Sequence, residues 1–135
     1  MATAKGGQTA LLLDTHAFLW WLDGDKQLPV AVRRRILATS RVHVSAASAW
    51  EITTKARLGK LPGALDVAAD VSACILGQSF VPLDITVSHA QRAGDLVSAH
   101  RDPFDRMLIA QAQVEDLVLV SNEIIFDQYG IRRLW

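Results

Sequence analysis

The sequence is poor in several features that mark specialised classes of protein. It holds a single cysteine, Cys74, so it cannot form an internal disulfide. Its 14 Lys and Arg residues are matched by 14 Asp and Glu residues, which leaves no formal net charge at pH 7. This balance excludes the broadly basic surface that dominates binding to duplex nucleic acid, so we expect any nucleic-acid contact to be local.

Long apolar runs are also missing. No run is long enough to cross a membrane, and the first one, residues 10–13, is too short for the core of a signal peptide. Together with the single thiol, which suits the reducing cytosol, this predicts a cytoplasmic protein. Cys74 lies among apolar neighbours, which predicts a buried thiol.

Length and composition predict one domain. Half of the 135 residues are hydrophobic, which is ample for a single packed core. Residues 1–9 are small, polar and glycine-bearing, and we expect them to form a flexible N-terminal tail. We expect residues 10–135 to form the domain.

Short apolar runs alternate with amphipathic segments along the rest of the chain. The runs that predict strands are 10–13, 42–44, 80–83, 117–120 and a last one that ends at Trp135. The segments that predict helices are 17–22, 28–38, 45–58, 65–76, 86–96, 102–115 and 124–129. The alternation predicts a three-layer α/β domain with a mainly parallel central sheet of about four to five strands flanked by helices.

Individual residues refine these elements. Pro82 cannot donate a backbone hydrogen bond, which indicates that the strand at 80–83 lies at a sheet edge or ends there. Ser45 and Thr86 are residue types that cap helix N-termini, and Gly59 is typical of a helix C-terminus.

Four acidic residues occur where predicted strands end or predicted helices begin. Asp14 follows the first strand, and Glu123 follows the fourth. Glu51 and Asp105 lie near the starts of two helices. Because sites in parallel α/β folds form beyond the carboxyl ends of the strands, we expect these four carboxylates to converge at one edge of the sheet.

Two of these acids, and Asp102 close to one of them, also have a purely structural interpretation. Asp102 followed by Pro103 predicts an N-cap and the first helical residue, and Asp105 then completes a capping box. Glu51 can form an ordinary surface ion pair with Lys55, four residues further along the helix. We assign Asp102 mainly to the cap, and we keep Asp105 and Glu51 as site candidates.

Carboxylates gathered in a partly buried cleft repel one another, so they either bind protons or hold a cation. Oxygen ligands without a His or Cys pair favour a hard cation, Mg²⁺ or Mn²⁺. The four histidines show no zinc-site spacing and have no cysteine partners. A cation held in this way orients a phosphate and supplies a hydroxide, which points to phosphodiester hydrolysis.

Four segments of the chain form a recognisable set. They are Leu11-Leu12-Leu13-Asp14-Thr15-His16, Ser48-Ala49-Trp50-Glu51-Ile52 with Lys55, the stretch 100–112, and Tyr129-Gly130-Ile131 with Leu134-Trp135. Together they resemble PIN-domain ribonucleases and, more narrowly, the VapC toxins of bacterial type II toxin–antitoxin systems. The resemblance covers nearly the whole chain after residue 9, and its most specific part is Asp-Pro-Phe-Asp-Arg with the continuation Ile-Ala-Gln-Ala.

The resemblance implies that Asp14, Glu51 and Asp105 form a catalytic acidic centre for Mg²⁺ or Mn²⁺. The family's usual fourth acid is an aspartate two residues after a Thr or Ser that follows the fourth strand. Ser121 matches that hydroxyl, and Glu123 stands at the acid position. Because a glutamate reaches one methylene further than an aspartate, we expect Glu123 to complete the ligand set through an indirect or water-mediated contact with the metal.

Polar and basic residues around these acids complete the expected site. Thr15 and Ser121 are the expected hydrogen-bond partners of the carboxylates. A chain with no net charge needs local cations to contact RNA phosphates. The candidates for such contacts are Lys55, Arg57, Arg101 and Arg106.

The resemblance implies a metal-dependent endoribonuclease that acts as the toxin of a toxin–antitoxin pair, works as a homodimer and is silenced by a cognate VapB-like antitoxin. The alternative is a non-enzymatic PIN-like interaction protein with a decayed metal site, which the glutamate at position 123 suggests. A phosphatase or receiver-like domain with Asp14 as phosphate acceptor is disfavoured, because no second aspartate stands two residues on.

Overall fold

Five short strands pair in parallel in the order β3-β2-β1-β4-β5. Their bounds are β1 Leu11–Leu13, β2 Val42–Ser45, β3 Val81–Leu83, β4 Val118–Val120 and β5 Arg133–Leu134. The computed structural model describes residues 9–97 and 100–135. The predicted N-terminal tail, residues 1–9, lies outside the described residues except for Thr9. The prediction of a parallel sheet of four to five strands is confirmed.

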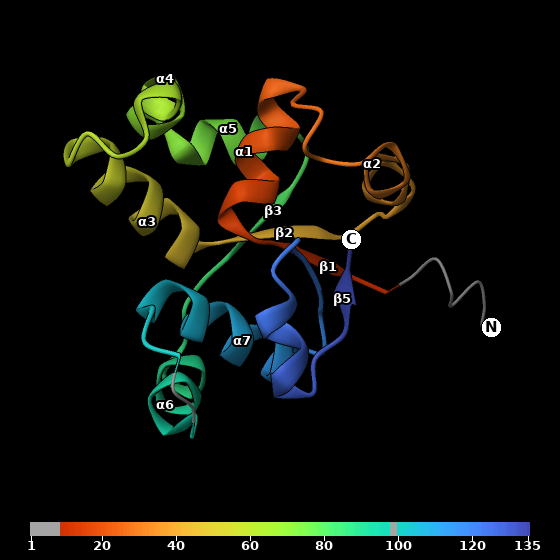
Figure 1. The fold of residues 1–135 in the computed structure, drawn as a ribbon, viewed down its shortest axis with the longest axis vertical. Coiled ribbons are helices and arrows are strands. Elements are labelled where there is room, and N and C mark those ends of the chain that lie inside the picture. The colour runs from red at the N-terminus through yellow and green to blue at the C-terminus, as the bar shows by residue number, and fades with distance from the viewer. Residues whose placement is uncertain (1–8, 98–99) are drawn as a thin grey trace.

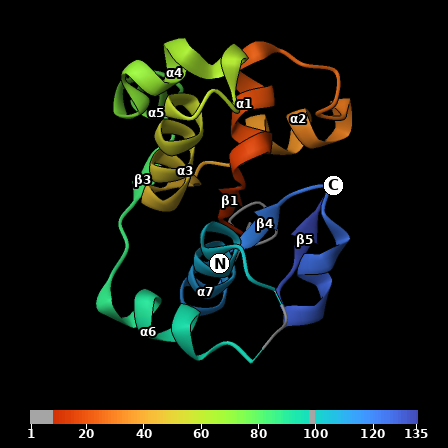
Figure 2. The ribbon, with the colours of Figure 1, turned by 60° about the vertical axis from the view of Figure 1, so that its left-hand side comes forward.

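Helices cover both faces of the sheet (Figures 1 and 2). On one face lie α1 (Thr15–Asp23), α2 (Val30–Ala38), α3 (Ala46–Arg57), the 3₁₀ turn η2 (Pro62–Ala64), α4 (Leu65–Ala69) and α5 (Val71–Gly77). On the other face lie α6 (Val87–Asp95), α7 (Pro103–Glu115) and the 3₁₀ helix η3 (Ile124–Tyr129). This is the three-layer arrangement that the alternation predicted.

The central strand β1 divides the core into two apolar clusters. Leu11 and Leu13 share one cluster with Phe18 of α1. Leu12 belongs to the other, with Leu108 of α7. All three leucines are completely buried, because a strand in the middle of a parallel sheet is covered on both faces.

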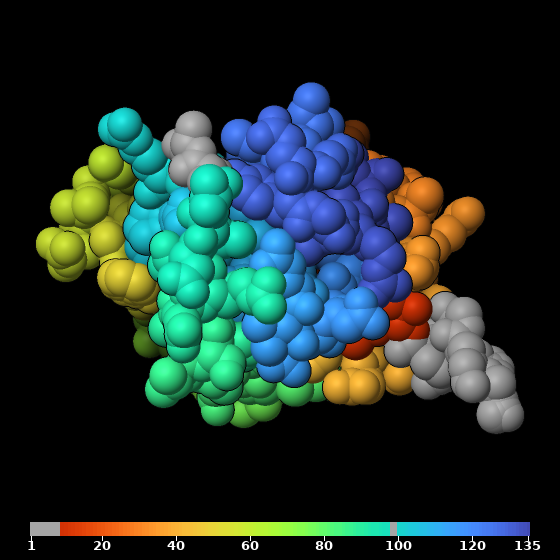
Figure 3. Space-filling model, turned by 90° about the horizontal axis from the view of Figure 1, so that it is seen from below, coloured from red at the N-terminus to blue at the C-terminus, as the bar shows by residue number. Residues whose placement is uncertain are grey.

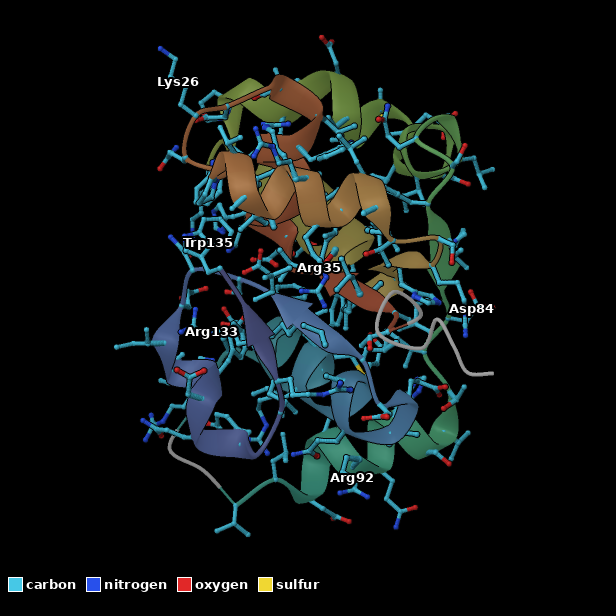
Figure 4. All side chains as sticks on the ribbon, turned by 90° about the vertical axis from the view of Figure 1, so that its right-hand side faces the viewer. Lys26, Arg35, Asp84, Arg92, Arg133 and Trp135 are labelled. Atoms are coloured by element: carbon cyan, nitrogen blue, oxygen red, sulfur yellow. The ribbon has the colours of Figure 1, made fainter. Side chains whose placement is uncertain are left out.

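The edges of the sheet agree with the sequence pattern. β3 is an edge strand, as Pro82 indicated, since a proline leaves a gap in the hydrogen-bond ladder that an edge tolerates. At the opposite edge, the ring of Trp135 lies 5.9 Å from the ring of Trp20 on α1. Figure 4 shows Trp135 at the end of β5, so the end of the described chain packs against the first helix.

Helix boundaries follow the predicted caps. The hydroxyl of Ser45 accepts a hydrogen bond from the backbone N–H of Ala47, and that of Thr86 accepts one from His89. Gly59, just beyond α3, has φ of +75°, a left-handed conformation that favours glycine.

The helix α6 lies beside α7 on the lower face of the molecule (Figure 3).

Two local predictions are wrong. The expected helix 65–76 is split into α4 and α5 at Asp70, whose carboxylate accepts a hydrogen bond from the backbone N–H of Ala73 and so starts a new helix. Cys74 is half-buried rather than buried, because α5 turns Val71 and Ile75 into the core and leaves the thiol at the margin.

Among the described residues, no helix is long and apolar enough to cross a membrane.

Candidate active site

Carboxylates from separate parts of the chain line one cleft. The cleft has a volume of about 160 Å³. Its lining residues are Asp14, Thr15, His16, Glu51, Lys55, Asp102, Asp105 and Glu123. The structure therefore brings together all four acids that the sequence singled out, with Thr15 and Lys55 beside them.

Asp14 links the end of β1 to the start of α1. Its backbone N–H donates to the carbonyl of Val120 at 3.0 Å, which joins the ends of β1 and β4. Its carboxylate caps α1 by accepting from the N–H of Ala17 at 2.8 Å. Burial raises the pKa of Asp14 to about 6, although hydrogen bonds from Ser121 and Ala17 act in the opposite direction. The carboxyl is therefore poised to lose or gain a proton near neutral pH.

Glu51 is a buried acid on α3, only 4% exposed. The hydroxyl of Thr15 donates to one of its oxygens at 2.6 Å. The ammonium of Lys55 contacts the other at 2.5 Å. This hydrogen bond is the main reason that the pKa of Lys55 is raised. The ion pair expected at i, i+4 is present, but it reaches into the cleft instead of lying on an open surface.

Asp105 lies in the first turn of α7, where Asp102 is the N-cap. The carboxylate of Asp102 accepts from the backbone N–H groups of Phe104 at 2.9 Å and Asp105 at 3.2 Å. Burial is the largest cause that raises the pKa of Asp105 to about 8, followed by the charges of Asp102, Glu123 and others in the cleft. Without a cation, Asp105 therefore holds its proton at neutral pH.

Ser121 connects the fourth acid to the first. Its hydroxyl oxygen accepts from the backbone N–H of Glu123 at 3.0 Å, and the hydroxyl donates to Asp14. Arg133 holds this segment from β5, because its guanidinium donates to the carbonyl of Ser121 at 3.0 Å and pairs with Asp127 of η3 at 2.8 Å. Figure 4 shows Arg133 on β5. The Glu123 side chain itself is exposed at the mouth of the cleft.

The donor set of the cleft fits a hard divalent cation, since carboxylate oxygens are the ligands that Mg²⁺ and Mn²⁺ prefer. Among residues 9–97 and 100–135, no three His, Cys, Asp or Glu side chains already converge closely enough to hold an ion. The carboxylates are directed at protein partners instead. Glu51 contacts Lys55, and Asp105 lies 3.0 Å from the imidazole of His100. Binding a cation therefore requires carboxylates to turn from these partners.

Three residues near the acids were not assigned to the site from the sequence. Asp102 lines the cleft in addition to capping α7, and His16 lines it beside Asp14. His100 contacts Asp105 directly. Their positions in the sequence could have indicated this, because each of the three stands within five residues of a predicted site acid.

The four basic candidates separate in the structure. Lys55 lines the cleft. Arg57 and Arg101 are exposed and are not among the described residues that line it. Arg106 does not line the cleft either, and its guanidinium donates hydrogen bonds to backbone carbonyls. These belong to Ala93, Gly94, Leu96 and His100.

Fold and cleft together define the class: an α/β domain with an acidic site where the strands of a parallel sheet end. The chain belongs to the PIN domain family, whose family model matches residues 11–131. The resemblance predicted from the sequence motifs is thereby confirmed at the level of the family. No curated protein matches the sequence.

Solved structures that share the fold include proteins of toxin–antitoxin systems. A chain of VapBC2 from Rickettsia felis, bound to a promoter DNA fragment, has a TM-score of 0.69 and 13% identity, covering 93% of this chain and 97% of that chain. A chain of DNA-bound VapBC from Salmonella typhimurium has a TM-score of 0.65 and 22% identity, covering 94% and 98%. Mycobacterium tuberculosis VapC20, a sarcin–ricin loop cleaving toxin, has a TM-score of 0.64 and 17% identity, covering 90% and 95%.

Proposed function

We propose that the protein is a metal-dependent endoribonuclease that hydrolyses phosphodiester bonds of RNA and acts as the toxin of a toxin–antitoxin pair. The observation that carries the proposal is the cleft in which Asp14, Glu51, Asp105 and Glu123 meet beside Lys55. PIN domains are in general divalent-metal-dependent nucleases. The fold is also that of VapC20, which cleaves the sarcin–ricin loop.

The roles of the acids follow from their positions. Asp14, Glu51 and Asp105 are the catalytic carboxylates that would hold Mg²⁺ or Mn²⁺, and Glu123 is the fourth ligand, direct or through water. The bound cation would supply a Lewis acid for the scissile phosphate and lower the pKa of a water molecule. Lys55 adds a positive charge at the wall of the cleft, where it can contact the anionic phosphate.

Hydrogen-bonding residues keep the acids in place. Thr15 donates to Glu51, and Ser121 donates to Asp14. Both hydroxyl residues are almost completely buried. Because such bonds fix the direction of a carboxylate, we infer that Thr15 and Ser121 position two of the ligands.

The experiment that tests this proposal uses purified protein and a mixture of cellular RNAs, with EDTA, Mg²⁺ or Mn²⁺. Wild-type protein is expected to give discrete fragments only with metal, and a folded Asp14→Asn protein is expected to give none. Equal cleavage by both proteins would contradict the proposal. Any co-purifying protein is first removed under denaturing conditions, and the refolded chain is checked by circular dichroism.

The alternative is an interaction protein without activity. Glu123 in place of the usual aspartate favours it, as does the pairing of Glu51 with Lys55. It predicts no binding of Mg²⁺ or Mn²⁺ and no cleavage, with tight binding of a small protein partner. Calorimetric titration with Mn²⁺ separates the two functions, because only the nuclease releases or absorbs heat on binding metal.

Two partners belong to the proposal as well. The VapBC structures that share the fold contain an antitoxin, and we infer that a VapB-like antitoxin binds and silences this chain. We also propose a homodimer. Co-purification of a small protein with the tagged chain from its own host tests the antitoxin, and light scattering of the purified chain tests the homodimer.

A further inference from the structure

A second hollow is lined by residues that neighbour those of the acidic cleft in the sequence. It has a volume of about 240 Å³, and its walls include Trp50, Ile85, Pro103, Phe104 and Met107. The only charged residue among its described lining residues is Arg106. That guanidinium donates to backbone carbonyls, so it offers little to a bound anion. We call this hollow the aromatic groove.

Two aromatic rings form a corner of the groove. The ring of Trp50 lies 4.8 Å from the ring of Phe104 at an interplanar angle of 78°. This edge-to-face arrangement fixes the direction of both rings. Trp50 is nevertheless 58% exposed. A tryptophan this exposed, with Phe104 as its aromatic neighbour, presents an apolar surface to solvent.

The groove and the cleft are both lined by residues of the same two helices, α3 and α7. Trp50 directly precedes Glu51 on α3, and Phe104 directly precedes Asp105 on α7. Successive residues of a helix are about 1.5 Å apart along its axis and about 100° apart around it, so each ring starts from the backbone position next to that of a cleft carboxylate. The two helices contact each other in the structure, and Figure 2 shows α3 above the start of α7.

Charge decides what can occupy the two hollows together. With the cation of the proposed function bound beside Lys55, the cleft would suit an anionic group such as a phosphate. The aromatic groove suits a flat, neutral group, because it lacks a free charge to pair with an anion. A nucleotide carries both kinds of group, because its sugar links an anionic phosphate to a flat, neutral base. Its base can stack on an aromatic side chain whatever its identity, because every base has a π face.

We propose that Trp50 and Phe104 form a stacking site for an unpaired nucleobase next to the scissile phosphate. This inference rests on the proposed function, since it takes the substrate to be RNA. A base can enter the groove only if it is not stacked in a helix, so the site selects single-stranded or looped RNA over a duplex. Trp50 is thus a residue for binding and selectivity, not a metal ligand.

The test measures binding of short fluorescent single-stranded RNAs in Mg²⁺ by anisotropy, in the Asp14→Asn protein, which cannot cleave under the proposed function. Added Trp50→Ala is expected to weaken binding about tenfold, the usual effect of losing one stacked base. Trp50→Phe is expected to keep most of the affinity, because it retains an aromatic face. The matched control is Leu37→Ala, which removes another exposed apolar side chain, on α2, and is expected to change nothing.

A second series places one abasic nucleotide at each position of the RNA. At one position the abasic RNA is expected to bind the parent protein as weakly as Trp50→Ala binds intact RNA. At that position Trp50→Ala is expected to add no further loss. Thermal melts of each variant serve as the control for folding.

The outcomes distinguish this inference from the proposed function. Unchanged RNA affinity in Trp50→Ala, or a loss that is the same for every abasic position, overturns the stacking site. Loss of a protein partner without loss of RNA affinity also overturns it and assigns the groove to that partner. If wild-type protein fails to cleave RNA but Trp50 still couples to one base, the stacking site stands and the nuclease proposal falls.

Discussion

Asp105 is the residue at which the charges of the cleft are least balanced. Its pKa of about 8 lies far above the ordinary 3.8, because burial and neighbouring acids disfavour its charged form. The folded protein therefore binds this proton more tightly than the unfolded chain between about pH 4 and pH 8. In that window the metal-free protein loses stability as the pH rises.

A neutral side chain at position 105 removes the loss of stability that comes from ionising a buried carboxyl beside other acids. We predict that Asp105→Asn raises the free energy of unfolding of metal-free protein at pH 8 by about 2 kcal/mol. This is well below the free energy that corresponds to the full pKa difference, because solvent screens a partly exposed carboxyl. Near pH 4 the two proteins are expected to be equally stable. Urea unfolding in EDTA at both pH values measures the difference. A variant that is less stable at pH 8 would contradict the assigned charge repulsion.

Thr15 supplies the short hydrogen bond to the buried Glu51. We predict that Thr15→Val lowers the free energy of unfolding by about 1–2 kcal/mol, since one carboxylate oxygen loses its partner without leaving the protein interior. The control is Thr53→Val, because Thr53 is exposed and its hydroxyl contacts only carbonyls of its own helix. Its expected change is within about 0.5 kcal/mol. Equal effects in the two variants would show that Thr15 has no special role.

For single residues, the sequence indicated which acids line the cleft but not which neighbours hold their side chains. Glu51 matched both a surface pair and a site acid, and the structure contains features of both, because its burial depends on packing against Thr15 of α1. Arg106 looked like a phosphate contact because its charge is visible in the sequence. The carbonyls that it reaches belong to another helix and a loop, which no local pattern reveals.

The first turn of α7 is the element that joins local structure to the cleft. Asp102 caps it and also raises the pKa of Asp105 by its charge. We predict that Asp102→Ala lowers the free energy of unfolding by about 1 kcal/mol. Asp102→Asn is expected to keep the cap and the stability while lowering the pKa of Asp105.

Urea unfolding and NMR titration of the Asp105 carboxyl measure the two effects. The control is Asp70→Ala, which removes the cap of α5 and is expected to cost similar stability without changing the pKa of Asp105. If Asp102→Ala is as stable as wild type, the capping role is wrong.

A second link between elements is Arg106, which ties α7 to the end of α6. Its guanidinium contacts the carbonyls of Ala93 and Leu96, each at 2.8 Å. We predict that Arg106→Lys lowers the free energy of unfolding by about 2 kcal/mol, because a single ammonium cannot reach several carbonyls at once. The exposed Arg57→Lys on α3 is the control and is expected to be neutral. Unchanged stability in Arg106→Lys would return Arg106 to the phosphate-contact candidates.

At the scale of elements, helix starts were predictable and one helix break was not. Ser45, Thr86 and Asp102 all cap helices as their residue types suggest. Asp70 interrupts a stretch in which apolar residues continue on both sides, so periodicity alone favoured one helix. The break becomes visible only when its carboxylate is seen to cap α5.

The whole molecule gathers acids that are far apart in the sequence because its sheet is parallel. β1 lies between β2 and β4, so the segments that follow these strands emerge at one edge, with Asp14 after β1 and Glu123 after β4. Alternating strands and helices were enough to predict this architecture. The choice of side-chain directions in the cleft was not predictable, since it depends on contacts such as Lys55 with Glu51 and His100 with Asp105.

Binding of a divalent cation in this cleft can be measured by thermal unfolding of the protein in EDTA, Mg²⁺ or Mn²⁺. At a hundredfold excess over Kd, metal is expected to stabilise the wild-type fold by about 2.7 kcal/mol, which raises the Tm of a chain of this size by about 10 °C. Asp14→Asn is expected to lose this shift, and Asp70→Asn, which is remote from the cleft, is expected to keep it. A wild-type Tm that is the same with and without metal, or an equal shift in Asp14→Asn, would show that these carboxylates do not hold a cation.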